Sequence, residues 1–367
     1  MATMTRKERF ERALEQREVD RLPFWVKIFG PDYLHRQQPR YRKMTDLELA
    51  DALDLDHMAG GGSPVVCSND RVQVTVQQRN GRRITRCRTP ERTLTGISGF
   101  DAGSQSWHPI EFPIKTLEDL RAARLIFAHN LFEASDRLVR NNHERLRAVG
   151  DRGIVLVGMG ISPLMNLIQH LMGPESTYYF LSDYPDEMEE LIGLMHEERI
   201  RYLKCLLASC PFDYVCSVEN TSTTLLSPEV FEKYCWRHLD DYGRLIAQAG
   251  KKHVLHMCGK LTALLPRINE LPSTAIEAYT APPVGDTTIA DRARLCPTKA
   301  VIGGTDATLW LRPVEEICAT IEASLRASGG MNGVVLTSAG VMTPLCPIEK
   351  IREVREYARR LTPAMFS

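Results

Sequence analysis

From residue 116 onward the sequence repeats one pattern: a short apolar run, a polar loop, and a longer segment with helical spacing. Helical patterns lie between the apolar runs, and strands that alternate with helices of this length indicate βαβ units and a parallel sheet. The regular repetition favours a (β/α)8 TIM barrel over an open doubly wound sheet. The apolar runs of strand length are residues 154–160, 214–219, 252–258, 274–279, 300–305 and 333–339.

The chain before residue 116 follows a different pattern. A helix is expected over residues 6–16, a short strand over 22–28 and a helix over 45–57. Residues 72–78 and 83–89 then alternate in polarity on either side of Asn80-Gly81, a dipeptide typical of a tight hairpin turn. We therefore predict one barrel domain over residues 1–367, with residues 60–115 as an inserted β-hairpin region.

The charge balance excludes several kinds of partner. Lys+Arg and Asp+Glu both number 46, so the net charge is near zero and gives no sign of nucleic acid or an anionic membrane as a partner. No apolar stretch is long enough to span a bilayer, and the charged N-terminus does not resemble a signal peptide. We expect a cytoplasmic protein, in which most of the 10 cysteines are free, buried and inert.

The sharpest local signal is the segment KKHVLHMCGK, residues 251–260. Alternate side chains of a strand share a face, so His256 and Cys258 are predicted to point the same way. Gly259 marks the end of this strand, and functional groups of parallel barrels gather at such ends. An imidazole and a thiol placed there can hold one zinc ion. The alternative is a buried histidine beside an ordinary core cysteine.

Four further polar residues stand at other strand ends. Glu219 ends the second run and is either a ligand or a loop carboxylate with local hydrogen bonds. Glu277 lies inside an apolar strand, where a carboxylate is costly unless it is paired, ligated or solvated. Asp306 follows a glycine pair and could instead cap the next helix, and Cys346 could be a loop cysteine without function. Their common location favours a joint catalytic role.

Motifs along nearly the whole chain resemble the uroporphyrinogen decarboxylase superfamily, which implies a single (β/α)8 barrel. The motifs occur in the superfamily's order: RKERFERALEQREVDRLPFW at the N-terminus, then LVGMGISPL, LLSPEVFEKY, VLHMCG, IGGTDATL and AGVMTPLCPIEKIREVREYAR. True decarboxylases of this superfamily hold a tetrapyrrole with an arginine-rich segment. Here that segment is WVKIFGPDYL, with Lys27 as its only cation, so decarboxylation of uroporphyrinogen is not expected.

The methyltransferase branch of the superfamily resembles this chain more closely. Enzymes similar to methylcobamide:thiol methyltransferases carry H-x-C on a barrel strand, an acidic ligand and a later cysteine around zinc. The resemblance places His256 and Cys258 in the H-x-C motif and Glu219 at the acidic position. The later cysteine departs from the pattern, because Ala339 stands near its usual place and Cys346 follows seven residues further on. The ligands of the zinc ion are then expected either to include Cys346 or to leave a fourth position open for solvent or substrate.

The resemblance implies a reaction in which zinc activates a thiol or polarises an O-, N- or S-methyl compound. The methyl group would travel to or from a corrinoid (methylcobamide) on a separate protein, because this chain has no D-x-H-x-x-G corrinoid motif. Glu277 and Asp306 are the candidates for orienting the small-molecule methyl donor or acceptor or moving a proton. A homodimer is the default assembly. The alternatives are a lyase acting on a small carboxylic acid and a non-catalytic barrel.

Overall fold

The computed structural model describes residues 3–28, 31–101 and 106–366. Its contacts divide the chain into two compact units. The first unit comprises residues 1–62, 140–160 and 211–367, and the second comprises residues 63–139 and 161–210. The second unit is therefore larger than the predicted inserted region 60–115, of which residues 102–105 lie outside the described part of the chain.

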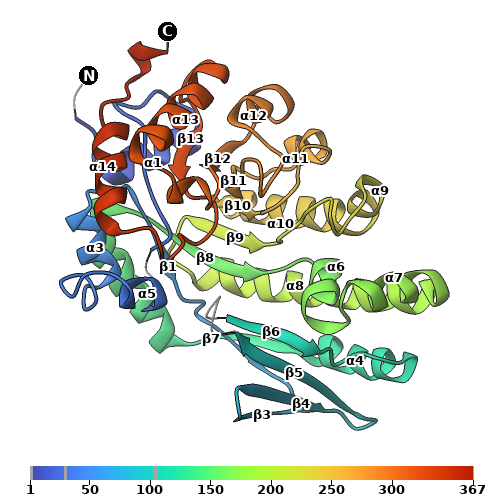
Figure 1. The fold of residues 1–367 in the computed structure, drawn as a ribbon. Coiled ribbons are helices and arrows are strands. Elements are labelled where there is room, and N and C mark those ends of the chain that lie inside the picture. Colours follow the sequence, from blue (N-terminus) through green and yellow to red (C-terminus); the bar gives the residue numbers. More distant parts are fainter. Residues whose placement is uncertain (1–2, 29–30, 102–105, 367) are drawn as a thin grey trace. The chain divides into compact units, whose positions relative to one another are not determined.

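The first unit is built on a curled parallel sheet (Figure 1). Its strands are hydrogen-bonded in the order β1-β8-β9-β10-β11-β12-β13, and each predicted apolar run forms one of the last six. The core residues of these strands are Val, Ile, Leu and Ala side chains buried on both faces, as parallel sheets require. The bounds are β1 (His57–Gly61), β8 (Gly153–Gly160), β9 (Tyr214–Val218), β10 (Lys252–His256), β11 (Ala275–Tyr279), β12 (Ala300–Gly304) and β13 (Val334–Thr337).

The sheet has seven strands, where the sequence predicted an eight-stranded barrel. The expected strand at residues 22–28 forms only two isolated parallel bridges beyond β13, Phe24 with Leu336 and Lys27 with Val341. The backbone carbonyl of Phe24 also accepts a hydrogen bond from the N–H of Asp56, next to the start of β1. Pro23 has no N–H to donate, which limits regular pairing of this segment. The segment therefore lies between the two edge strands without completing a regular ladder.

Helices follow the strands of the first unit and are set by clear end signals. Thr45 and Glu48 form a reciprocal capping box at one helix, and Thr288 and Asp291 form another. Residues 228–248 form one continuous helical run with a π-turn, η3 (Glu232–Trp236), between α9 and α10. The helices are α1 (Arg6–Leu14), α2 (Pro31–His35), α3 (Asp46–Ala52), α5 (Asp136–Val149, which begins in the second unit), α9 (Pro228–Phe231), α10 (Arg237–Gln248), α11 (Leu265–Glu270), α12 (Ile289–Leu295), α13 (Val314–Ala327) and α14 (Ile348–Ala358).

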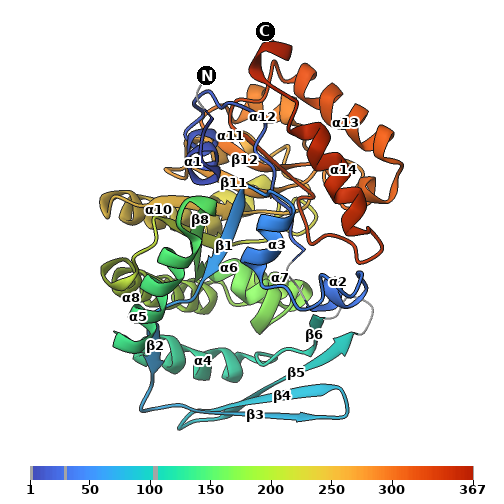
Figure 2. The ribbon, with the colours of Figure 1, turned by 90° about the vertical axis from the view of Figure 1, so that its left-hand side faces the viewer.

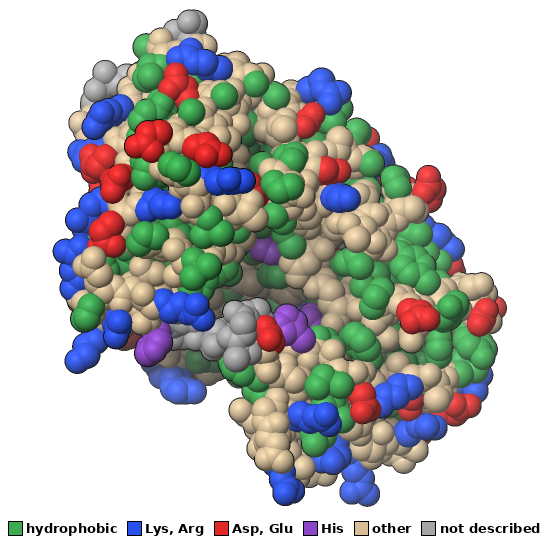
Figure 3. Space-filling model, in the orientation of Figure 1, with side chains coloured by type: hydrophobic (Ala, Val, Ile, Leu, Met, Phe, Trp, Pro, Cys, Tyr) green, Lys and Arg blue, Asp and Glu red, His purple; other side chains and the backbone are tan. Residues whose placement is uncertain are grey.

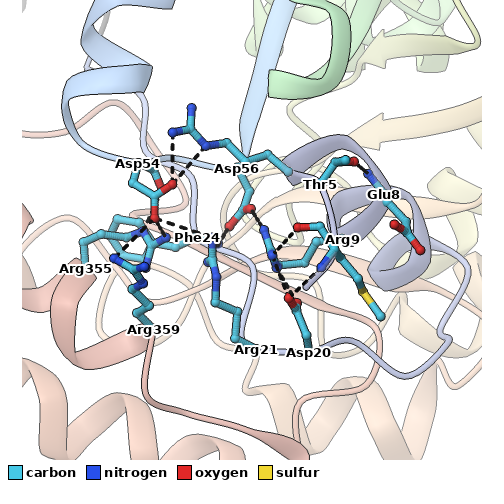
Figure 4. A network of polar contacts seen from close by, with 12 residues as sticks. Thr5, Glu8, Arg9, Asp20, Arg21, Phe24, Asp54, Asp56, Arg355 and Arg359 are labelled. Atoms are coloured by element: carbon cyan, nitrogen blue, oxygen red, sulfur yellow. Dashed lines mark hydrogen bonds and ion pairs between the residues drawn. The ribbon is translucent and has the colours of Figure 1, made fainter. Parts of the chain in front are cut away.

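A buried ion network fixes α1 to the first unit (Figure 4). The Arg9 side chain is 2% exposed, and its guanidinium donates to Asp20 at 2.6 Å and to Asp56 at 2.6 Å. Asp56 is fully buried and also accepts from Arg21 at 3.1 Å and from the N–H of Phe24 at 3.0 Å. The network thus joins the N-terminal helix to the segment beside β13 and to the start of β1.

The second unit combines an antiparallel sheet with helices (Figure 2). The predicted hairpin is confirmed: β3 pairs with β4, and Asn80 and Gly81 form the turn with φ of 51° and 68°. Positive φ at both positions is what a two-residue hairpin turn needs. The strands are β3 (Gln73–Arg79), β4 (Arg82–Arg88), β5 (Thr93–Asp101) and β6 (Ser106–Glu111), with a separate pair β2 (Val65–Ser68) and β7 (Leu131–Ala134); the helices are α4 (Leu117–His129), α6 (Pro163–Asn166), α7 (Pro174–Asp183) and α8 (Pro185–Ser209).

The surface carries both signs of charge. Figure 3 shows Lys and Arg side chains interspersed with Asp and Glu side chains over one face, in keeping with 46 residues of each class. Within the described part of the chain, no helix has the length and apolar character needed to cross a membrane.

One glycine of β8 permits the close approach of β1, and this leads to a prediction. A Cβ on Gly153 would stand 1.8 Å from the carbonyl oxygen of His57, whereas a Cβ on Gly158 in the same strand would meet nothing within 4 Å. We expect Gly153→Ala to lower the free energy of unfolding by about 2 kcal/mol or more, because backbone atoms must move to admit the methyl group. Urea unfolding of Gly153→Ala beside Gly158→Ala tests this, and equal midpoints for the two variants would contradict it.

Candidate functional site

His256 and Cys258 lie together where β10 ends. His256 is the last residue of the strand, and Cys258 follows two positions later. The Cys258 side chain acts on the His256 imidazole and raises the pKa of that ring. The Cys258 thiol also points to Asn220, with 3.4 Å between Sγ and Oδ1. The His256 side chain is 19% exposed, so a small molecule can reach this pair.

Glu277 on the neighbouring strand completes a charged cluster with His256 and Lys27. The register of β10 and β11 places His256 directly beside Glu277, and the imidazole Nδ1 is hydrogen-bonded to the Glu277 carboxylate. The other carboxylate oxygen, Oε1, lies 2.6 Å from the Lys27 ammonium. The Glu277 side chain is only 4% exposed, and Lys27 is 22% exposed. A buried carboxylate is thus held between two basic groups.

The two basic groups determine the protonation of this cluster. Burial raises the pKa of Glu277, but the hydrogen bond from His256 and the charge of Lys27 lower it more, so the pKa of Glu277 lies below its usual range. Burial lowers the pKa of His256, but hydrogen bonds with Cys258 and Glu277 outweigh this and raise it to about 9. In the protein without metal, the pair is therefore an imidazolium and a carboxylate at neutral pH.

Glu219 comes close to the same place through the backbone. The N–H groups of Glu219 and Asn220 both donate to the carbonyl oxygen of His256, at 3.0 Å each. Glu219 is fully buried, and its charge acts on the thiol of Cys216 together with that of Glu277. Burial and these carboxylates raise the pKa of Cys216, which keeps it as a thiol. The end of β9 is thereby fixed against the end of β10.

Asp306 and Cys346 are bound elsewhere in the first unit. Asp306 accepts from the N–H of Thr308 at 2.7 Å and from its hydroxyl at 2.5 Å, a local turn contact rather than the helix cap that the sequence left open, because the N-cap of the following helical turn is Thr308. Cys346 is fully buried, and burial raises the pKa of its thiol to about 11. Its carbonyl oxygen accepts from the Tyr33 hydroxyl at 2.7 Å. Among the described residues, no hydrogen bond or ion pair joins either residue to His256.

The donor set supplies part of a zinc site. His256 and Cys258 provide an imidazole and a thiol two residues apart at the end of β10, and Glu277 binds Nδ1 of His256 as a carboxylate often does behind a metal-bound histidine. Within the residues that the structure describes, no group of three or more His, Cys, Asp or Glu side chains is already arranged around one point. The fit is therefore of two ligands and a supporting carboxylate, with the third ligand not in place.

Comparison with known proteins identifies the family. Residues 110–361 match the family model described as uroporphyrinogen decarboxylase (URO-D). The chain belongs to the uroporphyrinogen decarboxylase family. No curated protein sequence matches the chain significantly. The resemblance found in the sequence is confirmed at the level of this family.

Solved structures support the fold of this URO-D family chain. A methyltransferase from Methanosarcina mazei matches with a TM-score of 0.61 at 15% identity, over 97% of this chain and 98% of that chain. A D-psicose 3-epimerase structure determined in the presence of D-fructose matches at 10% identity over 61% of this chain and 82% of that chain. Its TM-score of 0.37 is too low to support an argument. The first match extends the likeness in fold to the N-terminal residues outside the family model.

Sequence reasoning missed two members of the site in this URO-D family chain. Lys27 was noted only as the single cation of its segment, and its partnership with Glu277 depends on residues 250 positions apart in the sequence. Asn220, next to Glu219, was not predicted to belong to the site, although the Asn220 side chain accepts a hydrogen bond from the Cys258 thiol. A lysine inside the apolar run LPFWVKI was the available signal for the first, because a buried cation needs a partner.

Proposed function

We propose that this chain is a zinc-dependent methyltransferase that moves a methyl group between a corrinoid on a separate protein and a small thiol or an O-, N- or S-methyl compound. The observation that carries this proposal is the hydrogen bond of His256 Nδ1 with the buried carboxylate of Glu277, at the end of β10 where Cys258 follows two residues later. The structural likeness to a protein named as a methyltransferase over almost the full length of both chains supports it.

Zinc would be held by the His256 imidazole and the Cys258 thiolate, with Glu219 as the third ligand and a fourth position open to substrate. Glu219 is the candidate because its backbone N–H donates to the carbonyl of His256 and its side chain is buried. When bound there, zinc supplies Lewis acidity, which keeps a coordinated thiol as the thiolate at neutral pH. That Cys346 is a zinc ligand stays a prediction from the sequence. In the structure its thiol bonds locally to the carbonyl of Pro347.

The remaining charged residues would position the ligands and the substrate. Glu277 fixes the orientation of the His256 ring through Nδ1, and this leaves Nε2 for metal or substrate. Lys27 lies 2.6 Å from the second oxygen of Glu277 and neutralises it, so this carboxylate would support His256 rather than bind a metal itself. A role of Asp306 in orienting substrate or moving a proton stays a prediction. In the structure its carboxylate accepts a hydrogen bond from Thr308.

Metal analysis of four purified proteins tests the proposal. We expect about one zinc per chain in the wild type and in Cys346→Ala, and loss of zinc in His256→Ala and Cys258→Ala. The rate at which a panel of thiols demethylates methylcobalamin, followed by absorbance, should be lower in the variants that lose zinc. The reverse assay with methyl ethers and methylamines then shows in which direction the enzyme transfers the methyl group. A folded wild type that takes up no zinc when it is supplied, or zinc retained in both His256→Ala and Cys258→Ala, would contradict the site.

Lys27 favours a second candidate function, a lyase acting on a small carboxylic acid. A half-buried ammonium next to a partly exposed imidazolium can bind a substrate carboxylate. This alternative predicts release of carbon dioxide or a small product from a carboxylic acid without methylcobalamin. The methylcobalamin assay and a carboxylic acid panel, run on the same preparation, separate the two functions.

A further inference from the structure

The hairpin sheet of the second unit has one face dominated by arginine. In β4, the side chains of Arg82, Arg86 and Arg88 alternate with the rest and so share a face. Arg79 on β3 lies directly opposite Arg82 in the register, which adds a fourth arginine to the same face. The other β3 members of this face are polar and exposed: Gln73, Thr75 and Gln77. We refer to Arg79, Arg82, Arg86 and Arg88 as the arginine face.

The charge of the arginine face is not balanced within β3 and β4; the acidic residues of the other two strands are Asp101 on β5 and Glu111 on β6, and Glu111 pairs with Lys115. Residues 73–88 contain five arginines and no Asp or Glu, although the whole chain has equal numbers of basic and acidic residues. Of the four arginines, only Arg86 bonds to another side chain within the described part of the protein, the neutral Gln77 at 3.0 Å. By contrast, the nearby Arg92 pairs with Asp119 at 2.6 Å. The positive charge of this face is therefore available to another molecule.

Protection of a sheet edge does not account for these arginines. Basic residues on edge strands discourage strand addition by other chains, and Arg79 on the edge strand β3 could serve that purpose. Arg82, Arg86 and Arg88, however, lie on β4, which is paired on both sides by β3 and β5. Like charges directly opposite each other, such as Arg79 and Arg82, destabilise a sheet. The arrangement lowers stability and gives no protection in return, which points to a binding role.

The aromatic side chains of the sheet distinguish between two kinds of anionic partner. Single-stranded nucleic acid is usually bound by aromatic rings on which bases stack. Here Trp107 packs against Phe100 at 5.4 Å and lies beneath Arg83, which alternates with Arg82 and so belongs to the opposite face. The arginine face therefore offers guanidinium forks without a stacking ring. Guanidinium groups match carboxylates in a bidentate geometry, which favours an acidic protein surface.

We propose that the arginine face binds the carboxylate-rich surface of a partner protein. The arginine face lies on two strands of 7 residues each, which cover roughly 230 Å² at ordinary strand spacing, well below the ~800 Å² per partner of a stable complex. The contact is therefore transient and salt-sensitive, as suits a carrier that must leave after each transfer. The identification of this partner as the corrinoid carrier rests on the proposed function, whereas the binding of acidic protein does not.

Three variants with known charge test the proposal. The first replaces Arg82, Arg86 and Arg88 by Gln, and the second replaces them by Lys, which keeps the charge. The matched control replaces three exposed arginines of the first unit, Arg36, Arg237 and Arg360, by Gln, which changes the net charge by the same amount. The probes are a fluorescent oligoglutamate peptide and an oligothymidylate of equal charge, with binding followed by anisotropy at low and high salt.

The peptide should bind the wild type, the Lys variant and the control, and bind the Gln variant of the sheet at least about tenfold more weakly at low salt. Equal loss in the sheet variant and the control, or tighter binding of the oligothymidylate at the same arginines, would overturn the proposal. Turnover of free methylcobalamin should be the same in all variants. If free methylcobalamin is not turned over by any of them, the proposed function fails, while the peptide measurement still decides the binding surface.

Discussion

Glu277→Gln is expected to lower the free energy of unfolding by about 3 kcal/mol, because it leaves the Lys27 ammonium and the His256 imidazolium without their buried counterion. The partial exposure of Lys27, 22%, keeps this estimate at the lower end of the range for broken buried pairs. Zinc affinity and methyl transfer should fall roughly 10–100-fold, since the carboxylate that orients His256 is lost. Urea unfolding and metal titration measure the two effects.

The double variant Lys27→Met, Glu277→Gln separates stability from function. Removing both members of an ion pair restores much of the stability that removing one member costs. We expect the double variant to unfold closer to the wild type than Glu277→Gln does, while zinc affinity and activity stay low. Recovery of activity together with stability would show that Glu277 acts only through folding and has no part in positioning His256.

Arg9→Met is the second change for which we expect a large effect, about 3–5 kcal/mol in the free energy of unfolding. Arg9 is 2% exposed and bonds to both Asp20 and Asp56, so its loss leaves a fully buried Asp56 with only Arg21 and the Phe24 N–H as donors (Figure 4). Arg40→Gln, which breaks an exposed pair with Glu349, is the control and should change the urea midpoint little. Similar midpoints for the two variants would contradict a structural role of the buried network.

The pH dependence of the same variant adds a check on its cause. Burial raises the pKa of Asp20. The hydrogen bonds from Arg9 and from the Met4 N–H, together with the charge of Arg9, lower this pKa by more, so the net shift is downward. A carboxyl with a lowered folded pKa contributes stability above its ordinary pKa of about 4 and loses that contribution as the pH falls. The difference in the free energy of unfolding between the wild type and Arg9→Met should therefore become smaller as the pH falls toward and below about 4. If this difference in the free energy of unfolding stays constant from neutral to acid pH, the loss of stability in Arg9→Met comes from packing alone.

The sequence alone determined the parallel sheet and the hairpin. Apolar runs of strand length separated by helical patterns placed β8 to β13 within one or two residues, because burial on both faces demands uninterrupted apolar side chains. Asn80-Gly81 specified its turn through backbone conformations that few other residues adopt. The eighth strand was wrongly expected to be regular, since the pattern of residues 22–28 does not reveal which backbone groups find partners.

Of the candidate site, the sequence predicted that His256 and Cys258 share a face, because strand periodicity is a local property; for Cys258, which follows the last residue of β10, this stays a prediction. Only the tertiary structure decided that Glu277 and Lys27 join His256, while Asp306 and Cys346 bond elsewhere. Those contacts depend on the register between strands and on the segment at residues 22–28 beside β13, which link residues far apart in the chain. Local spacing fixes the direction of a side chain, whereas long-range packing selects its partner.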